Sequence, residues 1–569
     1  MQLGLETNLD ELGHAIENWK TADPRLFSVC LCKLAQNGAG YPPDQLSRLL
    51  RALEHKMPLI SVDMCRELVK SFNVPTSWIQ LPSPILEDVI RLLIGLSIQF
   101  SELTGEVCDI CAQVVLLQTN PNIQQITSYL DTSAAFVSAL LTAAPHSEAL
   151  LVQQLCNKFP GWRKQMRDIL LALFGILHII SDSQSASYFS ASSKCALVRI
   201  VCKLIVDFNL SLDESFPQKE NKSIELCLPG DVEDAEKRRK FMHEILETQT
   251  GDDGKILRKL ELTTWLMMVY IKPICFSPAS KLDWPLLCSI FKCMRDFFSQ
   301  YVLPVKFSFP SLALLCLYTA SLRRGLMINW TESLWTTIKD EQQDCETRIS
   351  ALAYLTCFLA HTRACILDLV VEILHDMAAW CIDYVYRCRN VLLVNCEQSF
   401  VTANQVYYAV CDSLLYILVQ LHATLLDSPH YRSSCNRLPL AQIRLSPLHP
   451  WQHLPDSLRW GFSRVASAYR LSCVPIGLDL VNWNNDDREF SLQTLEAIQP
   501  SRFFCLPLLE TSSSILCPIA KALFRTPVIG KAFVESEVHL SGVQLGHLQK
   551  SVPHVGIDVS KLSRIINDE

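Results

Sequence analysis

Residues 344–363 read DCETRISALAYLTCFLAHTR, and no other stretch says more about how this chain folds. On a helical projection Leu352 and Leu359 fall on one face, whereas Leu355 and Phe358 fall on another. A helix that is apolar on several sides needs neighbours on several sides. The stretch therefore predicts a helix inside a stack of helices.

The polar residues of this stretch gather at its two ends. Asp344 is placed to cap the first turn, and Glu346 adds a negative charge where the helix dipole favours one. Arg348, His361 and Arg363 lie where a buried helix meets solvent or a partner.

Composition supports the same interpretation for the whole chain. The 569 residues are 49% hydrophobic and 19% charged, with only 18 glycines, so the chain is rich in core residues and has few places for tight turns. A chain of this length suits several domains or one elongated array. Although the mean hydropathy is +0.18, no uninterrupted run of about 18 apolar residues exists. We expect no membrane span, and residues 1–10 carry no secretory signal pattern.

Helical periodicity dominates most of the chain, and short segments join most of the predicted helices. The predicted helices span residues 9–20, 26–37, 43–56, 62–72, 84–101, 105–118, 121–130, 133–144, 146–158, 161–180, 194–208, 233–248, 254–270, 284–300, 310–324, 331–339, 344–361, 364–386, 402–426 and 456–472. We expect Pro310 to open one of these helices, which would close with Arg323, Arg324 and Gly325.

Paired helices of similar length, without an exact sequence repeat, are typical of an all-α, HEAT-like α-solenoid of antiparallel helix pairs. A compact bundle fits a chain of this length less well. Acidic residues gather where the periodicity fades, so we predict a solvated, partly disordered loop there. The predicted parts are an N-terminal helical arm (1–210), this acidic loop (211–255), a C-terminal helical arm (256–526) and a flexible tail (527–569).

The 24 cysteines are spread almost evenly and lie mostly inside apolar helical patterns. Buried thiols pack like small hydrophobic groups, and without an export signal we expect a reduced compartment and no disulfide framework. Cys108 and Cys111 form a lone CxxC in a helical pattern. Zinc or redox use is the alternative to a pair of buried thiols.

Motifs for catalysis or cofactor binding are missing from the sequence. It contains no HExxH, no GxSxG, no glycine-rich phosphate loop and no dinucleotide fingerprint. We therefore expect no cofactor, no metal site and no enzymatic activity, and a thiol-dependent enzyme is the last-ranked alternative. The net charge of −7 argues against a chain that coats nucleic acid, so we expect no sequence-specific DNA contact.

Two polar clusters are candidate sites. The densest cationic run is a nuclear localisation signal or, alternatively, a solvated helix face; it consists of Lys237, Arg238, Arg239 and Lys240. The second cluster lies between two apolar helices and contains Ser181, Ser183, Ser185, Ser187, Ser190, Ser192 and Ser193. A polar loop between helices is one interpretation of this serine segment. A regulated contact is the other, since phosphate would add roughly two negative charges per site.

A fixed pattern of residues includes the stretch 344–363 and extends beyond it. It runs without a gap from Leu334-Trp335 through Arg348, Ala351, Tyr354 and Phe358-Leu359-Ala360 to Arg363. Further matching positions are Tyr407-Tyr408, Cys411, Tyr416, Val419, His422, Leu425-Leu426, Leu445-Ser446-Pro447-Leu448, Leu454-Pro455, Phe462 and Tyr469, with Lys158-Phe159-Pro160, Arg163 and Lys164 upstream. In this pattern the chain resembles the RNA polymerase I-specific transcription initiation factor family, also called transcription initiation factor IA.

The chain departs from the family pattern at a few places. His361 and Leu421 stand where basic residues are usual, and residues 503–508 only partly match the family's Phe-Pro-Phe-Asp-Pro-Tyr segment.

The resemblance implies a non-catalytic HEAT-repeat factor of the nucleus and nucleolus. Such a factor binds RNA polymerase I and bridges it to promoter-bound core (selectivity) factor subunits at ribosomal RNA genes. The resemblance also implies a docking role for Arg348, His361 and Arg363, and a polymerase contact at the serine segment that phosphate would repel. A generic HEAT-repeat scaffold or transport adaptor with other protein partners is the alternative function. We expect no membrane partner, and the oligomeric state, a homodimer included, is left open.

Overall fold

The structure is a computed structural model of the chain. It describes residues 43–59, 61–72, 83–116, 126–212, 229, 235–249, 256–276, 281–305, 309–388, 403–471, 513 and 515–525. The predicted helices at 9–20 and 26–37, most of the acidic loop, residues 503–508 and the predicted tail lie outside the described residues.

Helices make up nearly all the regular structure of the described residues. Outside the helices, the pairs Phe276 with Leu282 and Thr362 with Phe524 form isolated β-bridges. The all-α prediction is confirmed. The described helices fall into two compact units, which divide between Met294 and Arg295 and are called unit 1 and unit 2 below.

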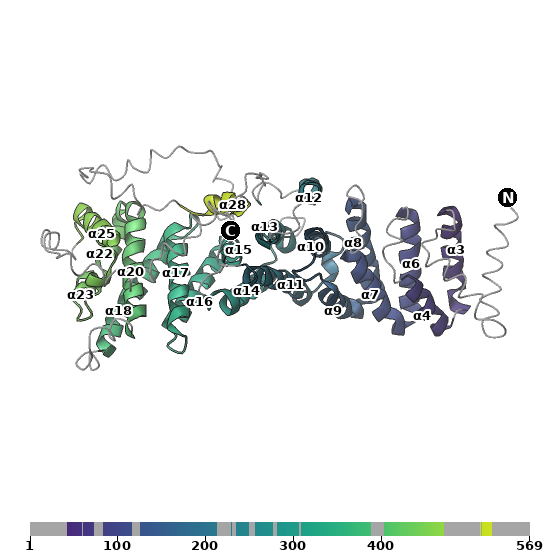
Figure 1. The fold of residues 1–569 in the computed structure, drawn as a ribbon, viewed down its shortest axis with the longest axis horizontal. Coiled ribbons are helices and arrows are strands. Elements are labelled where there is room, and N and C mark those ends of the chain that lie inside the picture. The colour runs from purple at the N-terminus through teal and green to yellow at the C-terminus, as the bar shows by residue number, and fades with distance from the viewer. Residues whose placement is uncertain are drawn as a thin grey trace. The chain divides into compact units, whose positions relative to one another are not determined.

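Unit 1 is built from two layers of helices. Its elements are α3 (Pro43–Lys56), η1 (Met57–Leu59), α4 (Val62–Ser71), α6 (Ser83–Gln99), η2 (Ser101–Leu103), α7 (Thr104–Val115), α8 (Ile126–Ala143), η4 (Pro145–Ser147), α9 (Glu148–Lys158), α10 (Met166–Ser181), η5 (Ala186–Tyr188), α11 (Ala191–Leu210), α12 (Ala235–Gln249), α13 (Ile256–Cys275) and most of α14 (Trp284–Phe297). Alternate helices pack together: α6 on α8 and α8 on α10 in one layer, α7 on α9 and α9 on α11 in the other (Figure 1). This alternation is the arrangement of a helical-repeat stack.

The backbones of α7 and α10 meet at Gly175 in the middle of α10. A Cβ atom built on Gly175 would lie 1.8 Å from the carbonyl oxygen of Val115. A glycine inside a helix costs about 1 kcal/mol relative to alanine. This position accepts that cost because no side chain fits between the two helices.

Unit 2 contains residues 344–363, the stretch from which the fold was predicted. Its elements are η7 (Phe298–Val302), α15 (Ser311–Ala320), α16 (Arg324–Lys339), α17 (Cys345–His361), α18 (Leu367–Cys388), α20 (Gln405–Gln420), α21 (His422–Leu426), α22 (Pro429–Asn436), α23 (Leu440–Arg444), α24 (Pro450–His453), α25 (Asp456–Tyr469) and α28 (Leu516–Leu523). The opening stretch forms α17, which packs against both α16 and α20 (Figure 1). Every residue from Ser350 to His361 is buried. The prediction of a helix inside a stack is confirmed.

Several predicted boundaries differ from the structure. The two helices expected at 121–130 and 133–144 form the single helix α8, in which the Thr132 hydroxyl donates to the Ser128 carbonyl instead of ending the helix. The helix expected at 402–426 is divided at Leu421. Helix α13 and most of α14 belong to unit 1 rather than to an arm starting at 256, because α13 packs on α10 and α11.

The expected end of the helix after Pro310 was wrong. Pro310 does precede α15, but α15 ends at Ala320. Arg324 and Gly325 begin α16, because the backbone at Arg323 is extended and starts a new helix. The cations and the glycine therefore mark the start of the second helix. Helices α22, α23, α24 and α28 were not anticipated, since each is too short to show a helical period.

No single described helix is long and apolar enough to cross a membrane. The pair Ile126–Ala143 and Pro145–Lys158 passes such a test only when taken together, with a bend of 118° between them.

Candidate functional site

Asp344 and Arg348 fix the start of α17. The Asp344 carboxylate accepts a hydrogen bond of 3.0 Å from the Thr347 amide, and its hydrogen bonds with Thr347 lower the pKa of Asp344. The predicted cap is confirmed. The Arg348 Nε donates to the Ile338 carbonyl at 2.8 Å, in the last turn of α16. Arg348 therefore ties α16 to α17, and its side chain is half-buried.

The other end of α17 is covered by the segment that follows α28. The Arg525 amide donates to the His361 carbonyl at 2.6 Å, and the Arg363 amide donates to the Leu523 carbonyl at 2.9 Å. The Arg363 Nε also donates to the Phe524 carbonyl at 2.9 Å. Residues far apart in the sequence thus meet at this end of the helix.

His361 is buried, so its ring does not face solvent. Its Nε2 lies 2.8 Å from the Tyr416 hydroxyl of α20, and burial lowers the pKa of His361 to about 4. Of the three residues expected to dock a partner, only Arg363 is exposed. All three hold contacts inside unit 2.

The serine segment lies in unit 1 and runs from the last residue of α10, Ser181, to the first turn of α11, which contains Ser192 and Ser193. Its exposed members are Ser183, Ser187, Ser190 and Ser192, whereas Ser185 is buried and donates to the Ile179 carbonyl. Ser190 caps α11 by accepting from the Ser193 amide. Its own amide donates to the Glu148 carboxylate of α9 at 2.7 Å.

Glu148 gives the serine segment a negative neighbour. Burial, which would raise the pKa of Glu148, is outweighed by hydrogen bonds from Ser193 and Ser190, so the pKa is lowered. The carboxylate is therefore charged near neutral pH. A phosphate on Ser190 would be placed beside a like charge.

The cationic run lies on α12, which the acidic loop was expected to contain. Arg239 forms an ion pair with Asp131 of α8, and the Arg238 guanidinium lies 5.8 Å from the ring centre of Tyr270 of α13. Lys237 and Lys240 are exposed. The run is thus helical, with its two arginines turned to neighbouring helices and its two lysines toward solvent.

The structure brings the cationic run close to the start of the serine segment. Burial lowers the pKa of His178. The charges of Asp182 and Asp131 raise this pKa, and the charge of Arg239 lowers it. Asp182 lies within the serine segment, and Arg239 lies within the cationic run. Two clusters that were predicted separately therefore share one region of unit 1.

The CxxC pair shows no metal or redox geometry. Cys108 and Cys111 are buried on α7, and burial raises the pKa of Cys108 to about 11. Such a thiol is neutral and unreactive near pH 7. No group of three or more His, Cys, Asp or Glu side chains that could hold a metal ion occurs among the described residues.

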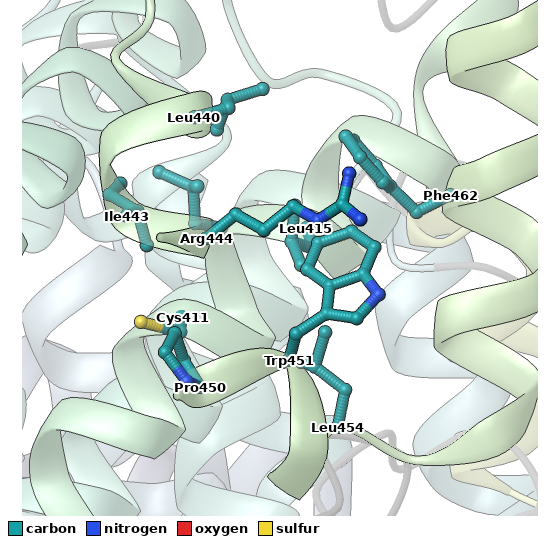
Figure 2. A pocket seen from close by; sticks show the side chains of 10 residues that line it. Cys411, Leu415, Leu440, Ile443, Arg444, Pro450, Trp451, Leu454 and Phe462 are labelled. Atoms are coloured by element: carbon teal, nitrogen blue, oxygen red, sulfur yellow. The ribbon is translucent and has the colours of Figure 1, made fainter. Parts of the chain in front are cut away.

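An apolar pocket lies among α20, α23, α24 and α25. Figure 2 shows the Arg444 guanidinium beside the Trp451 indole, with 5.4 Å between the guanidinium carbon and the ring centre. Phe462 meets the same indole edge to face at 5.5 Å. The pocket volume is about 20 Å³, which is room for about one water molecule. A pocket of this size is too small for a cofactor.

The description "RNA polymerase I specific transcription initiation factor RRN3" belongs to a family model that matches residues 7–497 of the chain. The chain belongs to the RRN3 family. The family resemblance inferred from the pattern around α17 is confirmed, and the chain is an RNA polymerase I-specific transcription initiation factor by family.

A solved structure supports the fold of this RRN3-family chain. "Crystal Structure of RNA Polymerase I Transcription Initiation Factor Rrn3" matches with a TM-score of 0.65, covering 92% of this chain and 98% of that chain. At 14% sequence identity the match bears on the fold alone. Comparison with curated proteins finds no match.

Sequence reasoning did not single out one feature of unit 2. A groove between α16 and α18 is lined by four carboxylates, those of Glu332, Asp368, Glu372 and Asp376. Three of them recur at four-residue spacing on α18, a signal that a search for acidic stripes on helices would have found.

Proposed function

We propose that this RRN3-family chain binds RNA polymerase I and bridges it to promoter-bound core factor subunits at ribosomal RNA genes in the nucleolus. The family match over residues 7–497 carries the proposal. Layered helical repeats suit this role, because they offer extended surfaces to large partners and need no active site. Family membership favours this function over a generic scaffold or transport adaptor.

For the polymerase contact we propose the serine segment of unit 1. Four of its serines are exposed, and its backbone is fixed by the Ser190 cap and by Glu148. A fixed polar surface of unmodified serines can dock a protein. Phosphate there would add negative charge beside Glu148 and oppose an acidic partner surface.

For partner docking by unit 2 we propose that Arg348 and Arg363 act indirectly, by holding the two ends of α17 in place. Each guanidinium donates to a main-chain carbonyl of another segment, that of Ile338 or that of Phe524. His361 contributes from inside, through Tyr416.

For nuclear import we propose the cationic run of α12. Lys237 and Lys240 are accessible, whereas Arg238 and Arg239 contact α13 and α8. Alanine at all four positions should keep a fluorescent fusion in the cytoplasm. Unchanged nuclear and nucleolar fluorescence would remove this role.

Affinity purification of the tagged chain from nuclear extract tests the proposed function. RNA polymerase I and core factor subunits should be recovered together, and depletion of the chain should lower pre-ribosomal RNA synthesis. Recovery of unrelated partners with normal pre-ribosomal RNA synthesis would point to the scaffold instead.

A further inference from the structure

Residues 427–471, which contain helices α22 to α25 of unit 2, form a strongly basic segment. The segment includes six arginines, no lysine and two acidic residues, Asp427 and Asp456. It thus carries a net charge of +4 in a chain whose net charge is −7. An arginine side chain binds a carboxylate through two parallel N–H donors, whereas a lysine acts as a point charge. The composition of this segment therefore favours an anionic partner.

Helix α25 has one buried face and one exposed face. Leu458 and Val465 lie on the first face and are buried, as expected for a helix that packs on α20. Trp460 and Ser467 lie on the opposite face and are exposed. Arg464 follows Trp460 by four residues and precedes Ser467 by three, so it shares their face. This face therefore presents a cation and an indole to solvent.

Three of the six arginines have their guanidinium groups over aromatic rings. The Arg464 guanidinium carbon lies 4.3 Å from the centre of the Trp460 ring, and that of Arg432 of α22 lies 5.6 Å from the centre of the Tyr469 ring. Figure 2 shows the third pair, which joins α23 to α24. Aromatic rings attract guanidinium groups. These side chains are thus held in place in advance, which lowers the entropy cost of binding an anion.

The arginines around α25 do not form ion pairs within the protein. Among the described residues no ion pair involves Arg432, Arg464 or Arg470. The nearby Asp427 carboxylate instead accepts a hydrogen bond of 2.8 Å from the Tyr469 hydroxyl. Arg470, directly after α25, is exposed. The guanidinium groups of Arg464 and Arg470 therefore remain able to pair with carboxylates of another molecule.

Trp460 is a separate indication that a protein binds here. It is 48% exposed even though the Arg464 guanidinium lies over its ring. Tryptophan and arginine are enriched among the residues that dominate protein–protein binding energy. An exposed indole between two arginines therefore offers an apolar contact as well as charge.

A nucleic acid fits this surface less well than a short protein segment does. Helix α25 has 14 residues, which is a length of about 21 Å. A long polyanion would extend past the helix, and the chain outside residues 427–471 carries a net negative charge that would repel it. A short acidic segment would meet only the arginines.

We propose that Arg432, Trp460, Arg464 and Arg470, called the arginine surface below, bind an acidic segment of a protein partner. Carboxylates of that segment would pair with Arg464 and Arg470, and an apolar side chain between them would contact Trp460. The proposal goes beyond the function proposed above, because it does not depend on which protein carries the acidic segment.

Fluorescence anisotropy with a synthetic peptide tests the proposal on the full chain. The probe is a labelled peptide of about 12 residues in which aspartate and glutamate alternate with leucine and serine. We expect saturable binding that weakens about tenfold or more between low salt and physiological salt, since exposed charge pairs are screened. A matched peptide with asparagine and glutamine in place of the acids should bind at least about tenfold more weakly.

Substitutions locate the binding site. The double variant Arg464→Glu/Arg470→Glu should weaken peptide binding at least about tenfold. The control Arg324→Glu/Lys339→Glu makes the same charge change at exposed positions at the two ends of α16 and should leave binding nearly unchanged. Trp460→Ser removes an exposed ring without changing the charge and should weaken binding about tenfold. If the double variant loses helicity, the result for Trp460→Ser decides.

A single-stranded oligonucleotide is the competing probe. An oligothymidylate of about 12 nucleotides should bind more weakly than the acidic peptide. Tighter binding of the oligonucleotide would make this a nucleic-acid surface and overturn the proposal. Equal losses in the double variant and its control, full binding by Trp460→Ser, equal binding of the neutral peptide, or no binding of the acidic peptide would also overturn it.

Discussion

The Nε2 atom of His361 lies 2.8 Å from the hydroxyl oxygen of Tyr416, and this pair joins α17 to α20 inside unit 2. The His361 side chain is 1% exposed, and burial lowers its pKa to about 4. The ring is therefore neutral near pH 7. It holds α17 by a hydrogen bond and by packing, not by charge.

This burial predicts that mild acid destabilises the protein through His361. The unfolded chain takes up a proton near the ordinary pKa of 6.5, whereas the folded chain resists protonation until about pH 4. The stabilisation is thus present above pH 6.5 and is lost as the pH falls toward 4, by up to about 1.4 kcal/mol per pH unit. Urea unfolding across this window should show a shallower pH dependence in His361→Gln, which does not titrate. Identical slopes in the two proteins would contradict this account.

Arg363 is predicted to fasten the segment after α28 to α17. Arg363→Ala removes the Nε hydrogen bond to the Phe524 carbonyl, and we expect a loss of about 1 kcal/mol of local stability. Amide hydrogen exchange at Leu523–Arg525 should become faster than in the parent protein. Exchange rates that stay the same would show that the side chain does not hold this segment.

Arg348, in the first turn of α17, and Arg363, just beyond its last residue, can be tested for partner binding. The double variant Arg348→Glu/Arg363→Glu should weaken polymerase or core factor binding. If binding falls while amide exchange in α16, α17 and α28 is unchanged, the arginines contact the partner directly. If binding falls and amide exchange in these helices becomes faster, the arginines act by holding the ends of α17 in place, as we propose. A folded variant that binds normally would show that neither role exists.

Gly175→Ala is predicted to destabilise unit 1. The added Cβ would overlap the Val115 carbonyl, and overpacking of this kind costs about 1–3 kcal/mol, which exceeds the helix propensity gained. Gly105→Ala is the matched control, because a Cβ at Gly105 in α7 meets nothing within 4 Å. Denaturant unfolding should show a loss for the first variant and a small gain for the second. Equal effects would disprove the close approach of α7 and α10.

The exposed serines are predicted to control polymerase binding. Ser190→Asp/Ser192→Asp places negative charge beside Glu148 at the start of α11 and should weaken binding about tenfold. Ser289→Asp is the control, since Ser289 is exposed on α14 of the same unit and outside the serine segment. If both variants bind as the parent does, the serine segment is not the contact.

The fold class was predictable from the residue pattern of α17. An apolar surface on several sides of 344–361 required several neighbours, and α16 and α20 supply them. Asp344 could be predicted as a cap because capping depends on local sequence. The division at Met294 could not be predicted, since it depends on α13 packing against α10 and α11.

The candidate site was less predictable because it also depends on packing between residues that are far apart in the chain. Sequence patterns placed Arg348, His361 and Arg363 at the ends of a helix but gave no sign of what covers those ends. The Thr362–Phe524 bridge and the hydrogen bond from Arg525 to His361 join residues that are far apart in the chain. The short helix α28 shows no helical periodicity in the sequence, so its contact with the end of α17 could not be predicted.

Direct binding of the purified chain to purified RNA polymerase I tests the central claim most directly. Gel filtration of the mixture should show a stoichiometric complex with RNA polymerase I and none with RNA polymerase II under the same conditions. The Ser190→Asp/Ser192→Asp variant should form less of that complex than the Ser289→Asp control. Absence of a complex with RNA polymerase I, or equal binding to both polymerases, would contradict the account.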